Sequence, residues 1–142
     1  MKKILVLCTG NSARSQLAQG YLQQFAGYRA EVLSAGVNPK GVNPLAVQVM
    51  AEDGIDISHH TSNHADEYIH IPFDYVITVC DNAREQCPFF PTVGERIHQS
   101  FPDPGHTSGE DALTSFRRVR DLIKTYSQEF IESRLGEPPV PQ

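Results

Sequence analysis

The first 25 residues place a continuous apolar run, a short polar loop and a helical pattern directly after one another. Residues 3–8 (KILVLC) are rich in branched apolar side chains, which is typical of a strand buried on both faces. In residues 15–25 (SQLAQGYLQQF) the apolar side chains recur at helical spacing, and Gly27 ends the pattern. A buried strand followed at once by an amphipathic helix predicts an α/β layer fold.

The rest of the chain repeats this alternation. We expect further strands at 30–35, 73–80 and, more weakly, 96–101, and further helices from Pro44 to about Asp53, over 61–68 and over 109–134. The predicted architecture is a three-layer sandwich, with a central four-stranded parallel sheet and helices on both faces. Its 142 residues suit a single domain over 1–135, and the proline-rich residues 136–142 are expected to form a flexible tail.

Composition excludes several classes of protein. No apolar run approaches the roughly 20 residues that span a bilayer, and the start of the chain lacks the pattern of a signal peptide, so we expect a cytoplasmic protein. The formal charge of −5 argues against nucleic-acid or anionic-membrane partners. Three cysteines, an odd number, indicate reactive thiols rather than a disulfide framework. No metal is predicted, because His59, His60, His64 and His70 lack the spacing of zinc ligands.

The polar loop that follows the first strand has the form Cys8-x5-Arg14. Five intervening residues suffice to bend the backbone round a tetrahedral oxyanion, with backbone N–H groups facing inward and the helix amino end adding positive charge. Arg14 offers a planar fork of donors to such an anion. The same positive surroundings favour the nucleophilic thiolate at Cys8.

The predicted oxyanion site takes in the whole loop. Gly10 and Asn11 tolerate the left-handed backbone angles that such a cradle needs, and Ser15 is expected to cap the helix and to donate a hydrogen bond to the Cys8 sulfur. The residues expected to bind the oxyanion are Thr9, Gly10, Asn11, Ser12, Ala13, Arg14 and Ser15.

Two further reactive residues are expected at the same edge of the sheet. Ligands of parallel α/β sheets collect at the carboxyl ends of the strands. Cys8 and Cys80 end the first and third predicted strands, and Asp103 lies between two prolines in the loop after the fourth. The sequence therefore predicts that Cys8, Cys80 and Asp103 converge.

The ordered blocks of this chain resemble the thioredoxin-coupled arsenate reductases, which share the fold of the low-molecular-weight protein tyrosine phosphatases. The resemblance covers residues 3–130 and rests on the motifs CTGNSARSQLA (8–18), SAG (34–36), GVNP (41–44), IDIS (55–58), HTS (60–62) and FRRVRD (116–121). It implies reduction of arsenate to arsenite by nucleophilic Cys8, with Asp103 as the general acid that protonates the departing oxygen.

The resemblance also implies a relay of disulfides through Cys8, Cys80 and Cys87. Cys80 attacks Cys8 and expels arsenite, Cys87 then attacks Cys80, and thioredoxin reduces the Cys80–Cys87 disulfide, so that no cofactor is required. If residues 80–87 were helical, the α-carbons of Cys80 and Cys87 would lie roughly 10 Å apart, beyond the reach of a disulfide, so the segment would have to unwind. Glutaredoxin is a less favoured reductant, because the pair can finish as an intramolecular disulfide.

Two rival functions remain. A low-molecular-weight phosphatase would use Cys8, Arg14 and Asp103 without Cys80 or Cys87, although Pro104-Gly105-His106 lacks the aromatic residues with which those phosphatases clamp a substrate ring. A loop that only binds phosphate, or cysteines that only sense oxidants, would give no turnover.

Some members of the resembled family bind potassium through Asn, Glu, Ser and Asp. The matching Asn11, Gln19, Ser34 and Asn63 lack both carboxylates, which argues against potassium dependence.

Overall fold

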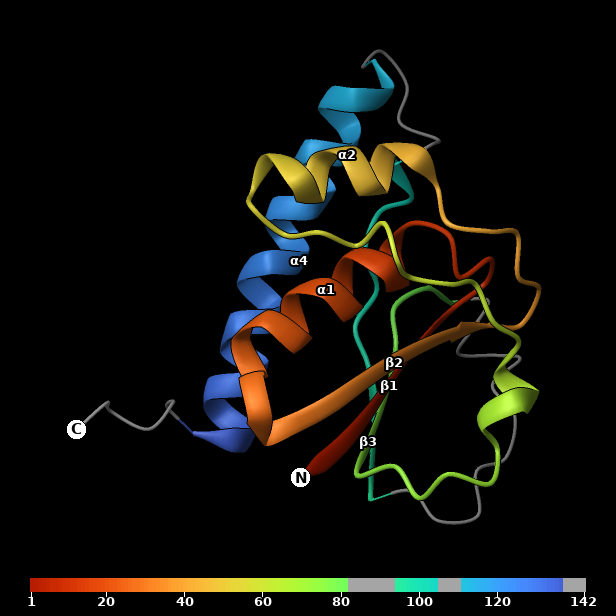
Figure 1. The fold of residues 1–142 in the computed structure, drawn as a ribbon, viewed down its shortest axis with the longest axis vertical. Coiled ribbons are helices and arrows are strands. Elements are labelled where there is room, and N and C mark those ends of the chain that lie inside the picture. Colours follow the sequence, from red (N-terminus) through yellow and green to blue (C-terminus); the bar gives the residue numbers. More distant parts are fainter. Residues whose placement is uncertain (82–93, 105–110, 137–142) are drawn as a thin grey trace.

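The strands of the protein form one parallel sheet, which confirms the predicted α/β class (Figure 1). The computed structural model describes residues 1–81, 94–104 and 111–136. The four strands of the sheet lie in the order β2-β1-β3-β4, and each neighbouring pair is parallel. They are β1 (Lys2–Cys8), β2 (Ala30–Gly36), β3 (Tyr75–Thr78) and β4 (Glu95–His98).

The helices flank this sheet. α1 (Arg14–Ala26) and α4 (Ala112–Leu135) lie together on one face, with α2 (Pro44–Glu52) beside them, and the short 3₁₀ helix η2 (Ala65–Tyr68) lies on the other side of the sheet (Figure 1). A further 3₁₀ turn, η1 (Gly27–Arg29), connects α1 to β2. Among the described residues, no helix has both the length and the apolar character needed to cross a membrane.

Several predicted boundaries are wrong. The predicted helix over 61–68 begins only at Ala65, because the backbone before it pairs with the end of β2: Gly36 N donates to Asn63 O at 2.8 Å. The third and fourth strands are shorter than predicted: they span Tyr75–Thr78 and Glu95–His98, although single backbone hydrogen bonds continue beyond them, from Val79 N to Leu7 O and from Gln99 N to Thr78 O. Residues 109–110 of the predicted last helix and most of the predicted tail lie outside the described residues.

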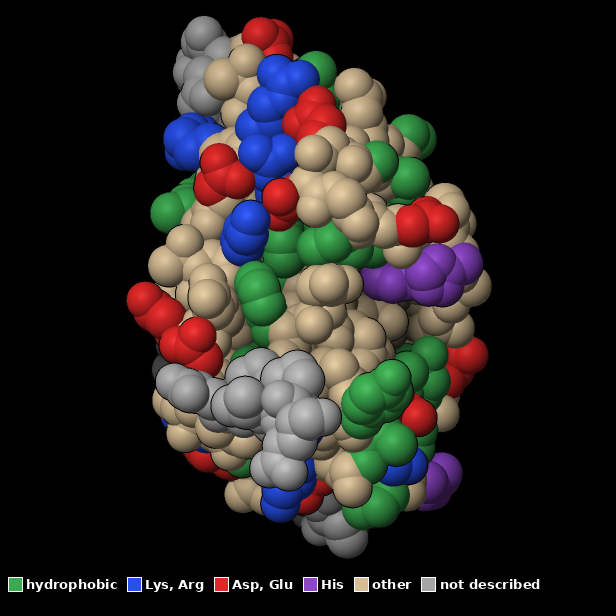
Figure 2. All heavy atoms as spheres, turned by 60° about the vertical axis from the view of Figure 1, so that its left-hand side comes forward, with side chains coloured by type: hydrophobic (Ala, Val, Ile, Leu, Met, Phe, Trp, Pro, Cys, Tyr) green, Lys and Arg blue, Asp and Glu red, His purple; other side chains and the backbone are tan. Residues whose placement is uncertain are grey.

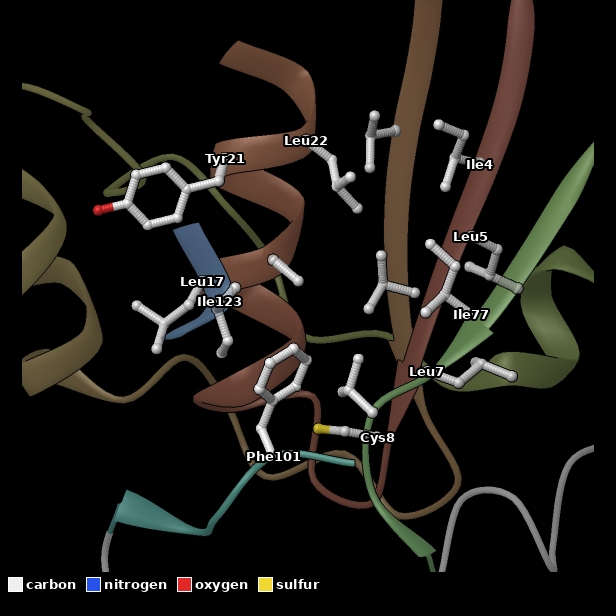
Figure 3. Close-up of a cluster of buried hydrophobic side chains, with 14 of the residues drawn as sticks. Ile4, Leu5, Leu7, Cys8, Leu17, Tyr21, Leu22, Ile77, Phe101 and Ile123 are labelled. Carbon is white, nitrogen blue, oxygen red and sulfur yellow. The ribbon is translucent and has the colours of Figure 1, made fainter. Parts of the chain in front are cut away.

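The core lies on both sides of β1, as its continuous apolar sequence predicts. Every residue from Ile4 to Cys8 is buried. Leu5 and Leu7 point away from α1, whereas the Cys8 sulfur points toward it and toward Phe101 (Figure 3). The alternation of a strand thus places Cys8 at the end of the sheet on the side that α1 covers.

The outer surface of α2 and α4 carries ion pairs. Basic and acidic side chains alternate there (Figure 2), and Arg120 contacts both Glu52 and Asp121 at 2.9 Å. Arg117 also pairs with Glu52, at 2.8 Å. Arg117 and Arg120 of the FRRVRD segment are thus held in ion pairs on this face, and neither is needed to explain the oxyanion loop.

Candidate active site

The loop between β1 and α1 opens onto a pocket of about 310 Å³. Asp103 and six predicted residues of the loop line this pocket; the six are Cys8, Thr9, Gly10, Ser12, Ala13 and Arg14. Lys40, Asn43 and Phe116 complete the lining. The pocket lies at the carboxyl end of β1, where parallel α/β sheets collect ligands. Cys8 and Asp103 therefore converge as predicted.

Each backbone carbonyl group of residues 8–13 accepts a hydrogen bond. Those of Cys8, Thr9, Gly10 and Ser12 accept hydrogen bonds from the backbone N–H groups of Val37, Asn38, Lys40 and Asn43, at 2.8–3.3 Å. Gln16 Nε2 donates to Asn11 O and Leu17 N to Ala13 O. No backbone N–H group of residues 10–13 donates to another described residue. The loop is thus held by its acceptors, and its donors remain available to an anion.

Asn11 holds the loop from inside the protein. It has a positive φ of 46° and is fully buried. Its side-chain amide donates to Ser15 Oγ at 2.9 Å and Ser34 Oγ at 2.8 Å, and its side-chain oxygen accepts a hydrogen bond from Asn63 N at 2.8 Å. The prediction of left-handed backbone is confirmed for Asn11. Gly10, by contrast, has no positive φ.

Gly36, at the end of β2, allows the loop to approach the sheet closely. A β-carbon at this position would lie 2.6 Å from Thr9 O and 2.8 Å from Asn11 N, closer than real β-carbons come. At Gly10 the corresponding distances are at least 3.6 Å, which is ordinary contact. The loop therefore requires glycine at position 36, on the neighbouring strand β2, more strictly than at position 10 in the loop itself.

Ser15 serves Cys8 but does not cap the helix. α1 begins at Arg14, its N-cap is Ala13, and no side chain makes a capping hydrogen bond, so the predicted capping role is wrong. Ser15 Oγ lies 3.1 Å from Cys8 Sγ. Asn11 donates to the same oxygen, so the Ser15 hydroxyl hydrogen can point at the sulfur; donation from Ser15 to Cys8 stays a prediction.

Arg14 is oriented by the loop that carries Asp103. Its Nη1 donates to Phe101 O at 3.1 Å, and its Nη2 lies 3.8 Å from Asp103 Oδ2. The Asp103 side chain is 42% exposed, so it can reach both the pocket and solvent. The Asp103 carboxyl group and the Arg14 guanidinium are thus neighbours, although 89 residues separate them in the sequence.

Cys80 lies beside the loop, just beyond the end of β3. Its sulfur is 3.2 Å from Thr9 Oγ1, and both Cys8 and Cys80 are buried, with only 3% of each residue exposed. Thr9 therefore joins the oxyanion loop to the second cysteine. Cys87 falls outside the described residues, as do Gly105 and His106 of the loop after Asp103.

Gln16 and His60 support the loop, and the sequence did not identify either in this role. Gln16 is fully buried; besides Asn11 O, it donates to Thr61 O at 3.0 Å, and its side-chain oxygen lies 3.0 Å from His60 Nδ1. Burial, together with the neighbouring His59, lowers the pKa of His60 to about 4. The ring is thus neutral at pH 7 and able to donate to Gln16. The spacing of the HTS motif gave no signal for this contact.

The positions that match a potassium site form a closed network of hydrogen bonds. The Ser34 hydroxyl donates to Gln19 Oε1 at 2.6 Å and accepts from Asn11, whose own oxygen accepts from the backbone of Asn63. The set is neutral and its oxygens already have donors, so these residues do not fit a cation. Among the described residues, no group of three or more His, Cys, Asp or Glu side chains is arranged to hold a metal.

Known proteins share both the sequence and the fold of this chain. It is 44% identical over 134 residues to an arsenate reductase of Halalkalibacterium halodurans, covering 93% of this chain and 96% of the relative. A solved arsenate reductase in the phosphate-binding state superposes with a TM-score of 0.82 at 32% identity, covering 94% of this chain and 98% of the other. A thioredoxin-dependent arsenate reductase of Corynebacterium glutamicum gives a TM-score of 0.70 at 27% identity, covering 94% and 61%. Because the model of the low-molecular-weight phosphotyrosine protein phosphatases matches residues 3–138, the chain belongs to that family.

Proposed function

We propose that the protein reduces arsenate to arsenite, with Cys8 as the nucleophile and thioredoxin as the final reductant. The observation that carries this proposal is the second buried thiol, Cys80, in contact with Thr9 of the oxyanion loop at 3.2 Å. A phosphatase needs a single cysteine, whereas reduction of arsenate requires two electrons, which a pair of thiols supplies when it is oxidised to a disulfide. The arsenate reductases among the relatives support the same reaction.

The first step is substitution at arsenic. The loop N–H groups and Arg14 bind arsenate, and the Cys8 thiolate displaces one oxygen to form a Cys8–S–As bond. Asp103, beside Arg14, donates its proton so that the oxygen leaves as water. Arsenic remains pentavalent in this step.

The second step transfers the electrons. The Cys80 thiolate attacks Cys8 Sγ, the S–As bond breaks, and its electron pair stays on arsenic, which leaves as trivalent arsenite. A Cys8–Cys80 disulfide is formed. Cys87 then attacks Cys80, which frees the Cys8 thiolate, and the dithiol of thioredoxin reduces the Cys80–Cys87 disulfide. The role of Cys87 rests on its sequence position and on the resemblance to the reductases.

The test is arsenite formation with thioredoxin, thioredoxin reductase and NADPH, compared among wild type, Cys80→Ser and Cys87→Ser. We expect many turnovers for the wild type, no arsenite from Cys80→Ser, and a single equivalent per protein from Cys87→Ser. Hydrolysis of p-nitrophenyl phosphate serves as the matched control, because both variants retain Cys8, Arg14 and Asp103. Absence of arsenate reduction in the wild type, with hydrolysis intact in all three proteins, would instead establish the phosphatase.

A further inference from the structure

Lys40 is a cation at the oxyanion pocket with no part in the steps described above. Its backbone is fixed to the loop, because Lys40 N donates to Gly10 O at 2.8 Å. Its side chain lines the same pocket as Cys8 and Arg14. The position of this charge is therefore set by the same hydrogen bonds that shape the loop.

The stem of Lys40 lies over the glycine of the loop. Its Cγ and Cδ atoms are 3.7 Å from the point that a β-carbon on Gly10 would occupy. These methylenes are at van der Waals distance from the loop, while the ammonium group of the exposed Lys40 stays hydrated.

The ammonium group has no acidic partner in the described part of the chain. Lys2 and Lys124 lie within 4 Å of Asp74 and Asp53, but no described carboxylate lies that close to Lys40. An ammonium that is not neutralised by the protein keeps its full charge for an incoming anion. Lys40 is exposed, so water and salt screen this charge in part.

The charge balance of the pocket calls for a second cation. As the general acid of the first step, Asp103 is protonated, so the charged groups at the loop are Arg14 and the reactive Cys8 thiolate, which cancel. A tetrahedral oxyanion such as arsenate or phosphate carries between one and two negative charges at neutral pH. Without Lys40, the described side chains that line the pocket would present no net positive charge to this anion.

We propose that Lys40 is a binding residue for tetrahedral dianions, acting with Arg14 at the opening of the pocket; this assignment rests on the proposed function of the loop. Lys40 lowers the dissociation constant and the KM for the oxyanion through its charge. It does not contact the sulfur atoms that exchange electrons, so kcat does not depend on it. Its contribution is that of one partly screened charge interaction, roughly 3- to 10-fold in affinity.

Equilibrium binding of inorganic phosphate to the reduced protein tests this directly. The variants are Lys40→Gln, which removes the charge, and Lys40→Arg, which keeps it. Lys2→Gln is the matched control, because it removes the same charge at the opposite end of β1. We expect Lys40→Gln to bind phosphate roughly 3- to 10-fold more weakly with a smaller dependence on ionic strength, while Lys40→Arg and Lys2→Gln bind like the wild type.

Steady-state arsenate reduction provides the second readout. In Lys40→Gln, KM for arsenate should rise by the same factor while kcat stays within twofold of the wild type. Equal phosphate affinity and equal KM in Lys40→Gln and wild type would overturn the assignment, as would an equal loss in Lys2→Gln. If neither the wild type nor any variant reduces arsenate, but Lys40→Gln still binds phosphate more weakly than the wild type, the proposed function fails while the role of Lys40 stands.

Discussion

The close approach of the loop to Gly36 predicts that Gly36→Ala damages both stability and anion binding. The added β-carbon would meet Thr9 O at 2.6 Å and Asn11 N at 2.8 Å, and neither backbone atom can rotate out of the way. Overpacking of this kind costs about 1–3 kcal/mol. For a chain of this size that corresponds to a fall in Tm of roughly 2–12 °C.

The same substitution should displace the loop itself, because it pushes on the carbonyl of Thr9 and the N–H of Asn11. Since small displacements of a binding loop cost large factors, we expect phosphate to bind at least roughly tenfold more weakly. Thermal unfolding followed by circular dichroism and phosphate titration by calorimetry measure the two effects on one protein preparation.

Gly10→Ala is the matched control for this prediction. It adds the same methyl group within the loop, but its nearest neighbours would be Ser12 Cβ at 3.6 Å and Lys40 Cδ at 3.7 Å, and no positive φ is involved. We expect its Tm to change by no more than about 2 °C. If Gly36→Ala were as stable as the wild type, or if Gly10→Ala lost more stability than Gly36→Ala, the contact with β2 would not be what shapes the loop.

Three further outcomes follow from the same contacts. Asn11→Ala removes three hydrogen bonds, two of them buried and one partly buried, and should lower the free energy of unfolding by about 2–4 kcal/mol in urea denaturation; an unchanged midpoint would contradict this. Arg120→Ala, whose side chain is 16% exposed, should cost about 1–3 kcal/mol, whereas Arg117→Ala, at 45% exposed, should cost below about 1 kcal/mol, and equal losses would refute the difference. Because burial holds the folded pKa of His60 at about 4, the unfolded chain takes up this proton first as pH falls below about 6.5. Wild-type Tm should therefore fall more than that of His60→Gln between pH 7.5 and 5, and equal falls would contradict the assignment.

The sequence predicted the elements that depend on neighbouring residues. The strand over 3–8, the loop and the helix after it are encoded in one continuous stretch, and the structure places them within a residue or two of the expected limits. The same stretch predicted six of the residues that line the pocket, whereas Asn11 and Ser15 are not among the lining residues and Lys40, Asn43 and Phe116 were not predicted. The stretch thus predicts the chemistry of the loop at one edge of the sheet, and the topology of the sheet brings the remaining site residues to that edge.

What the sequence did not predict depends on pairings between distant segments. Four of the loop carbonyls accept hydrogen bonds from backbone N–H groups of residues 37–43, and the Asn11 side chain donates to Ser34 and accepts from Asn63. Hydrophobic periodicity carries no information about these partners, because the contacts are made by backbone and polar side-chain groups. The capping role expected for Ser15 failed for a related reason: its hydroxyl is taken by Cys8 and Asn11.

Thr9 connects the oxyanion loop to the second cysteine, Cys80. Its carbonyl accepts the N–H of Asn38 at 2.8 Å, which fixes it to the rigid surround of the loop, while its hydroxyl contacts Cys80 at 3.2 Å. A loop anchored through its carbonyls can hold an anion without reorganising, which is the condition for strong stabilisation of charge during reaction. Cys80 is thereby kept beside the oxyanion loop. In the proposed reaction, Cys80 can thus approach Cys8 while the hydrogen bonds of the loop carbonyls keep the shape of the anion site.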